Sequence, residues 1–139
     1  MATSSKITKW HITYLKIADL ISEHSKAERR KVGAILVKAG RIISTGYNGT
    51  PSGFDNNCEE NGKTKPEVLH AESNAIAKCA KSTESSEHST LYVTISPCLE
   101  CAKLIIQCGI KEVYFKELYR ETSGLDLLKK AKVKYEQIF

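Results

Sequence analysis

Apolar residues recur at helical spacing near the start of the chain. The positions that repeat every three or four residues are Tyr14, Ile17, Ala18 and Ile21. Residues at this spacing share one face of an α-helix, so an amphipathic helix is predicted here. Two short apolar runs follow, Val32–Val37 and Arg41–Thr45, with Lys38–Gly40 as a turn between them. Their β-branched residues predict a β-hairpin.

The second half of the chain alternates between strand and helix patterns. Strands are predicted at Leu91–Ile95, Glu112–Phe115 and Val133–Phe139. Helices are predicted at His70–Ala80, at Pro97–Gly109, and after Ser123, which with Asp126 resembles a capping box. This alternation predicts a single α/β domain over residues 1–139, a three-layer α-β-α fold with a mixed five-stranded sheet.

Two segments between these elements are predicted to be loops. Gly46–Gly53 is rich in Gly, Asn, Pro and Ser, which suits a structured loop. Asn56–Lys65 is largely polar and is also predicted to be a loop. No internal repeat or low-complexity tract divides the chain.

Composition and charge indicate which class of partner the protein binds and in which cellular compartment it is found. A formal net charge of +5 favours an anionic partner, a nucleotide or a nucleic-acid backbone, although a solvated surface with spare lysines explains the same number. No apolar run approaches a membrane span, and Met1–Trp10 lacks the apolar segment of a secretory signal. We therefore expect a cytoplasmic protein without membrane contact. Disulfides are rare in that compartment, so the five cysteines indicate a metal site or catalysis first.

Two short motifs carry candidate chemistry. His70-Ala71-Glu72 begins one predicted helix, and the segment Pro97–Cys101 begins another, so both helix starts are expected at one edge of the sheet. Zinc binds histidine nitrogen and cysteine sulfur, and three protein ligands leave the open fourth position of a catalytic site. The candidate zinc ligands are His70, Cys98 and Cys101. Zinc can lower the pKa of bound water to about 7, which makes a nucleophile at neutral pH.

Glu72 is the candidate proton carrier. It lies two residues from a metal ligand, so its carboxylate can take a proton from water, pass it to a pyrimidine ring nitrogen and help protonate the leaving amine. The pattern H-x-E followed by P-C-x-x-C is the signature of zinc deaminases. The alternative is a closed structural zinc site with Cys58 as a fourth ligand, which leaves Glu72 and Pro97 unexplained.

The chain resembles the deoxycytidylate deaminase family in four segments. They are Val32–Ala34, Gly46–Gly53, His70–Ile76 and Pro97–Ile106. The resemblance runs in register from about Tyr14 to the last predicted strand. It implies a cytidine-deaminase-like fold, a zinc cofactor, hydrolysis of dCMP to dUMP and ammonia, and a homo-hexamer.

The resemblance also implies the roles of particular residues. Glu72 is expected to donate and accept protons beside the zinc ligands His70, Cys98 and Cys101. Asn48 is expected to bind the sugar, and the backbone N–H of Ala71 to hold the pyrimidine carbonyl. The loop expected to bind a regulatory nucleotide, dCTP as activator or dTTP as inhibitor, comprises Gly46, Tyr47, Asn48 and Gly49.

One departure from the family bears on the metal count. Many bacterial and phage relatives carry a cysteine where this chain has Ala27, and that cysteine joins the equivalent of Cys58 in a second, structural zinc site. Ala27 cannot ligate, and the segment from Cys58 to His70 is short. We therefore predict one zinc ion per chain.

A 5′-phosphate needs cationic partners, and the chain offers several. Arg30 is the first candidate, because a planar guanidinium can bond two phosphate oxygens at once. The other candidates are Lys26, Arg29, Lys31, Lys78, Lys81 and Arg120. Tyr119 is a candidate to stack on the base or touch the phosphate. For each of these residues, a solvated or packed surface position is the plainer alternative.

Two other functions are consistent with the motifs. A deaminase of single-stranded nucleic acid or tRNA would need aromatic stacking platforms and a basic groove, whereas aromatic residues make up only 7% of the chain. Nucleic acid is therefore the weaker prediction. The other alternative is a zinc-stabilised binding module without turnover. A Glu72→Gln variant separates these classes, because only an enzyme would lose ammonia release while keeping its zinc.

Overall fold

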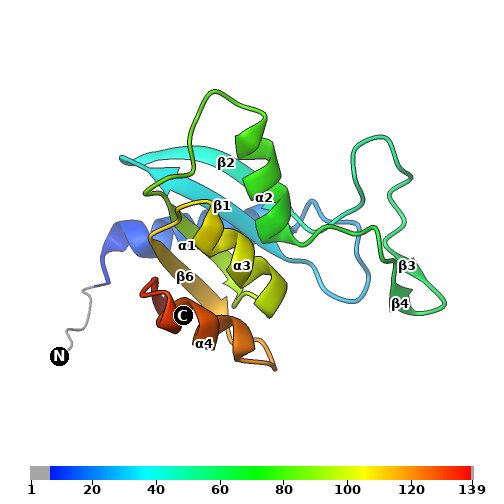
Figure 1. Ribbon diagram of the computed structural model, residues 1–139. Coiled ribbons are helices and arrows are strands. Elements are labelled where there is room, and N and C mark those ends of the chain that lie inside the picture. Colours follow the sequence, from blue (N-terminus) through cyan, green and yellow to red (C-terminus); the bar gives the residue numbers. More distant parts are fainter. Residues whose placement is uncertain (1–6, 139) are drawn as a thin grey trace.

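A mixed five-stranded sheet forms the middle layer of the protein (Figure 1). The structure is a computed structural model that describes residues 7–138, so Met1–Lys6 and Phe139 lie outside the described residues. The strands are β1 (Gly33–Lys38), β2 (Arg41–Tyr47), β5 (Thr90–Ile95), β6 (Glu112–Glu117) and β7 (Lys134–Gln137), in the order β2-β1-β5-β6-β7. β1 is antiparallel to both β2 and β5, whereas β5, β6 and β7 are parallel to one another.

Helices cover both faces of the sheet, because the strands send alternate side chains into two cores. The helices are α1 (Lys9–Ser22), α2 (Ala71–Ala80), α3 (Leu99–Gln107) and α4 (Ser123–Lys130). Ile35 and Val37 of β1 pack with α1, whereas Ala34 and Leu36 pack with α2, α3 and α4. The predicted three-layer α-β-α arrangement is confirmed. Among the described helices, none combines the length and the hydropathy that crossing a bilayer requires.

The sheet topology brings both motifs to one edge. β2 and β5 both run antiparallel to β1, and β6 runs parallel to β5, so these three strands point the same way. Their carboxyl ends therefore meet beside the residues that precede β1. α2 follows β2 through a long connection, and α3 follows β5 directly. Ligands bind at such an edge in many open α/β sheets.

Two glycines let other segments approach the motifs closely. A Cβ atom at Gly46 would lie 2.5 Å from the backbone nitrogen of Ala75, so only glycine allows β2 and α2 to pack this tightly. A Cβ atom at Gly124 would lie 2.2 Å from the carbonyl oxygen of Pro97, which places α4 directly against the segment that leads into α3. Both contacts help to fix the positions of the two helix starts.

The two motif helices begin slightly later than predicted. α2 begins at Ala71 rather than His70, and α3 begins at Leu99 rather than Pro97. His70 and Cys98 are the N-cap residues, and both have extended backbone, with ψ of 157° and 175°. Two predicted metal ligands therefore occupy the same kind of position, the residue before a helix.

Two further predictions require correction. β2 continues to Tyr47, so Gly46 and Tyr47 belong to a strand and not to the predicted loop. The predicted capping box at Ser123 and Asp126 is wrong. Thr122 is the N-cap of α4, its ψ of 8° lies outside the extended region, and its side chain makes no capping bond.

The segment Asn56–Lys65, predicted to be a loop, contains a small β-hairpin. Its strands are β3 (Glu59–Glu60) and β4 (Lys63–Thr64). Asn61 and Gly62 form the turn with φ of 55° and 76°, the left-handed conformation that a type I′ turn requires. The hairpin projects from the body of the fold (Figure 1).

Candidate active site

The three predicted metal ligands converge at the edge of the sheet. His70 Nδ1 lies 3.5 Å from Cys98 Sγ and 3.3 Å from Cys101 Sγ, and all three ligand atoms lie within 4.8 Å of one another. Zinc bonds of about 2.0–2.3 Å in a tetrahedron place ligand atoms roughly 3.5–3.8 Å apart. The three predicted ligands therefore have a geometry that fits one zinc ion.

This cluster contains three protein ligands and not four. Within residues 7–138 it is the only group of three or more His, Cys, Asp or Glu side chains close enough to hold a metal ion. The thiol of Cys58 instead donates to the carbonyl of Asn56, at 3.6 Å. The alternative of a closed site with Cys58 as a fourth ligand is therefore wrong.

The surroundings of Glu72 and of the three predicted metal ligands shift their pKa values. Hydrogen bonds from Cys101 and His70 lower the pKa of the Cys98 thiol to about 3, and the same contacts raise the pKa values of Cys101 and His70. Glu72 is only 3% exposed, and this burial raises the pKa of its carboxyl to about 7. A buried carboxyl with a near-neutral pKa is suited to accept and return a proton.

A cavity of about 580 Å³ adjoins the cluster, a volume within the range of roughly 300–1,000 Å³ for small-molecule sites. The predicted site residues that line it are Arg30, Asn48, His70, Ala71, Glu72, Cys98 and Tyr119. They come from the segment before β1, the end of β2, the starts of α2 and α3, and the segment after β6. We call this the substrate cavity.

Asn48 ties two parts of the cavity wall together. Its Oδ1 accepts the N–H of Val32 at 2.9 Å, and its Nδ2 donates to the carbonyl of Arg30 at 2.7 Å. The carbonyl of Asn48 accepts the hydroxyl of Ser25 at 2.7 Å. A primary amide has two acceptor sites and two donor hydrogens, so the side chain retains bonding capacity for a ligand.

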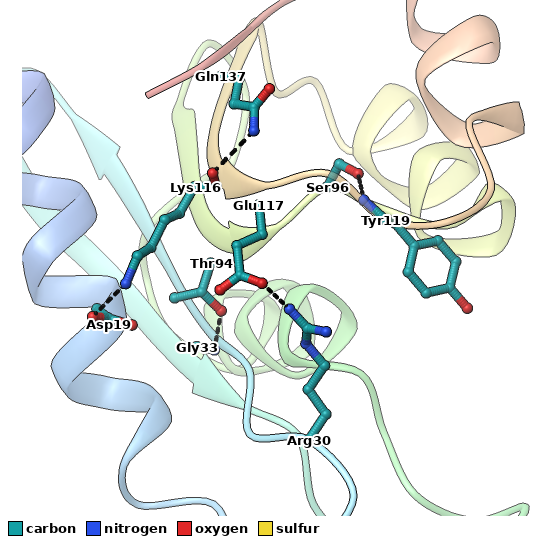
Figure 2. A network of polar contacts seen from close by, with 9 residues as sticks. All are labelled: Asp19, Arg30, Gly33, Thr94, Ser96, Lys116, Glu117, Tyr119 and Gln137. Carbon is teal, nitrogen blue, oxygen red and sulfur yellow. Dashed lines mark hydrogen bonds and ion pairs between the residues drawn. The ribbon is translucent and has the colours of Figure 1, made fainter. Parts of the chain in front are cut away.

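Arg30, before β1, and Tyr119, after β6, both line this cavity, and Figure 2 shows Arg30 extending toward Glu117. The guanidinium of Arg30 forms an ion pair with Glu117 at the end of β6, and their side chains are 52% and 55% exposed. The N–H of Tyr119 donates to Ser96 Oγ at 2.7 Å, which anchors the segment after β6. Arg29 and Arg120 line the same cavity, so three arginines favour an anion there.

The remaining predicted residues lie elsewhere. Gly46 is buried between β2 and α2, and Lys31 lines neither cavity. Tyr47 and Gly49 line a second cavity of about 570 Å³. Of the basic phosphate candidates, those at this second cavity are Lys26, Lys78 and Lys81.

The cavity-lining residues that sequence reasoning did not single out include two buried polar ones. Glu59 is 8% exposed and Ser96 is 2% exposed. The Asn61-Gly62 pair, a strong hairpin signal, would have placed Glu59 in a strand. No sequence signal singles out Ser96, which lies between β5 and α3.

Comparison with known proteins agrees with this geometry. Residues 8–117 match the family model described as the cytidine and deoxycytidylate deaminase zinc-binding region. The crystal structure of the dCMP deaminase of cyanophage S-TIM5, in complex with dCMP and dUMP, matches with a TM-score of 0.93 and 48% identity, over 96% of this chain and 100% of that chain. The deoxycytidylate deaminase of enterobacteria phage T4 is 39% identical over 77% of each chain. The human deoxycytidylate deaminase is 40% identical over 77% of this chain and 64% of that protein.

Proposed function

Because the chain belongs to the cytidine and deoxycytidylate deaminase zinc-binding family, we propose that it hydrolyses dCMP to dUMP and ammonia. The predicted enzyme class, a hydrolase that acts on a C–N bond, is confirmed by the family and by the named relatives. One observation carries the substrate assignment. A single cavity is lined by two members of the metal cluster and by Glu72, and also by three arginines suited to a phosphate.

Zinc held by His70, Cys98 and Cys101 would supply a Lewis acid that makes water nucleophilic near neutral pH. The chain's own residues move the protons. The carboxylate of Glu72 accepts one proton from the attacking water and passes it to ring N3 as the C4–O bond forms. It then accepts the remaining proton of that oxygen and gives it to the 4-amino group, which leaves as ammonia when the C4–N bond breaks. The N–H of Ala71, at the first position of α2, has no acceptor within the helix and holds the pyrimidine carbonyl.

Asn48 and Arg30 bind the sugar and the phosphate. The side-chain amide of Asn48 binds the sugar with the donor hydrogen and the acceptor site that its bonds to Val32 and Arg30 leave unused. Arg30 exchanges Glu117 for the 5′-phosphate. That exchange is favourable because an exposed ion pair contributes only about 0–1 kcal/mol, whereas an arginine–phosphate contact can be bidentate. Tyr119 packs against the bound nucleotide from the segment after β6.

The second cavity is our proposed site for a regulatory nucleotide, with dCTP as activator and dTTP as inhibitor. It is lined by Tyr47, Gly49 and three lysines, with no acidic side chain among its described lining residues. A nucleoside triphosphate is strongly anionic and suits such a lining. Asn48, between Tyr47 and Gly49, lines the substrate cavity, so one short segment borders both cavities. Gly46 contributes through its packing on α2.

Kinetics with added nucleotides test this regulation. We expect dCTP to raise and dTTP to lower the rate with dCMP in the unmodified protein. A Lys78→Ala/Lys81→Ala variant should lose both responses, whereas Lys63→Ala, at the exposed tip of the β3–β4 hairpin, should keep them. Equal responses in both variants would contradict the assignment.

We also propose a homo-hexamer in the cytoplasm. Five apolar side chains on the described surface are between 43% and 66% exposed, which suits burial between subunits. They are Trp10, Leu20, Phe54, Leu104 and Leu118. Light scattering of the purified protein should give six times the monomer mass, and a monomer would contradict the hexamer.

An ammonia-release assay tests the function directly. The substrates are cytosine, deoxycytidine, dCMP, CMP, dCTP and a single-stranded oligonucleotide, each with and without a zinc chelator. We expect the highest kcat/KM with dCMP, none with the oligonucleotide, and loss of activity with the chelator. An inert dCMP together with rapid turnover of deoxycytidine would overturn the substrate assignment.

A further inference from the structure

Glu59 is a buried acidic side chain to which the proposed mechanism assigns no task. It is 8% exposed, stands at the start of β3, and lines the substrate cavity together with Arg29 and Arg30. Burying a carboxylate is unfavourable unless its oxygens are bonded. Its contacts therefore indicate what the residue does.

One oxygen of this carboxylate holds the backbone just ahead of β1. Glu59 Oε2 accepts the N–H of Glu28 at 3.0 Å and the N–H of Arg29 at 3.2 Å. Both bonds cross about 30 residues of sequence, so they fix the hairpin and this segment relative to each other. Hydrogen bonds to an ionised acceptor are about twice as strong as neutral ones.

The arginine-bearing segment depends on few anchors. Residues 28–32 form neither helix nor strand. Glu59 holds the amides of Glu28 and Arg29, and Asn48 holds the carbonyl of Arg30 and the amide of Val32. These two side chains therefore hold the backbone from which the guanidinium groups of Arg29 and Arg30 extend, toward Thr64 and Glu117 respectively.

The second oxygen of Glu59 points to a function beyond packing. Oε1 is buried and makes no hydrogen bond, and it is the only such side-chain atom found among residues 7–138. An unsatisfied buried acceptor is destabilising, and such costs are tolerated most often at functional sites. A role in fold stability alone would favour a side chain whose acceptors are all satisfied.

We propose that Glu59 is a positioning residue for phosphate binding, which holds Arg29 and Arg30 where they can reach the 5′-phosphate of the substrate. The proposal rests on the proposed dCMP deaminase function. Glu59 acts through the backbone of residues 28 and 29, so it affects binding of the phosphorylated substrate rather than the chemistry at Glu72.

The hairpin offers a matched control for the test. Glu60 follows Glu59 in β3 but is exposed. In Glu59→Ala we expect KM for dCMP to rise about tenfold while kcat falls less than about threefold. With deoxycytidine, which lacks the phosphate, both constants should change less than about threefold. Glu59→Gln keeps a hydrogen-bond acceptor without the charge, so its KM for dCMP should lie between those of the unmodified protein and Glu59→Ala. Glu60→Ala should match the unmodified protein.

A purely structural role would change both substrates alike. Equal losses with dCMP and deoxycytidine, or an E59A variant that matches E60A, would overturn the proposal. If E59A does not fold, E59Q carries the same comparison.

Calorimetry with dUMP and deoxyuridine supplies a readout without turnover. The affinity for dUMP should fall about tenfold in the Glu59 variants, and that for deoxyuridine should not. If the unmodified protein shows this binding pattern but releases no ammonia from dCMP, the proposed function fails and the positioning role stands. Unchanged dUMP affinity in the Glu59 variants would overturn the positioning role alone.

Discussion

Two regions of the substrate cavity are built in different ways. The metal region (His70, Glu72, Cys98 and Cys101) lies at the starts of α2 and α3, which pack on the sheet. The arginine region (Arg29, Arg30 and Glu59) lies on a segment without regular structure and on a two-residue strand. The first is fixed by helix packing and the second by a few side-chain bonds. We therefore expect changes in the metal region to affect metal binding and kcat, and changes in the arginine region to affect KM.

Removing one ligand should have the largest effect. Cys101→Ser replaces a buried sulfur ligand by a hydroxyl that binds zinc poorly, so both zinc and activity should be lost. Zinc content per chain and ammonia release measure the two. Cys108→Ser is the control, because Cys108 is partly exposed and lies outside the cluster. A zinc-replete and active C101S protein would contradict the metal region as described.

Glu72→Gln should separate metal binding from proton transfer. The amide cannot carry protons, so kcat should fall by about 10²- to 10⁴-fold while zinc content stays unchanged. Glu100→Gln is the control, since Glu100 is an exposed carboxylate in the first turn of α3 that pairs with Lys103. Undiminished ammonia release from E72Q would contradict the role of Glu72 as the proton carrier.

Arg30→Ala should show the complementary pattern in the arginine region. Loss of a charge-assisted phosphate contact should raise KM for dCMP about 10- to 100-fold with a smaller change in kcat. Arg30→Lys should recover part of the affinity, because lysine keeps the charge but not the planar fork. The neighbouring Lys31→Ala serves as the control, since Lys31 lines neither cavity. A fall in kcat alone would break the division between the two regions.

Of these variants, Gly46→Ala should change kcat and KM least, but it should lower the free energy of unfolding measurably. Its new Cβ would meet the backbone of α2, so we expect a loss of about 1–3 kcal/mol and a Tm lower by about 3–10 °C. At Gly49 the nearest atoms to an added Cβ are 3.8 Å away, so Gly49→Ala should keep its Tm. Thermal unfolding of the two variants tests whether the metal region depends on this close packing.

The two regions also differ in how far the sequence predicts them. His70, Glu72, Cys98 and Cys101 could be predicted because each lies within a few residues of its partners in a short motif, and regular strands and helices bring the two motifs together. The apolar run at β1 and the alternation of strand and helix patterns after Leu91 likewise predict the sheet. Strands that are buried on both faces, such as β1 and β5, consist mostly of apolar residues and are easy to recognise in the sequence.

The arginine region is less predictable because its bonds are long-range and irregular. Glu59 meets amides about 30 residues away, and no periodicity links those positions. The sequence placed Arg30 first because of its planar guanidinium but left two other arginines and four lysines open. The structure places the three arginines at one cavity and three of the lysines at the other. In this region only the Asn61-Gly62 pair is a recognisable sequence signal. It predicts the hairpin turn but not the bonds that Glu59 makes to the segment before β1.

We expect one zinc ion to be held by three side chains at two helix starts, with its fourth coordination position left to a non-protein ligand. X-ray absorption at the zinc edge of the purified protein measures this shell directly. We expect two sulfur atoms at about 2.3 Å together with one histidine nitrogen and one oxygen at about 2.0–2.1 Å. A shell with a third sulfur, or with four protein ligands of any kind, would contradict the account.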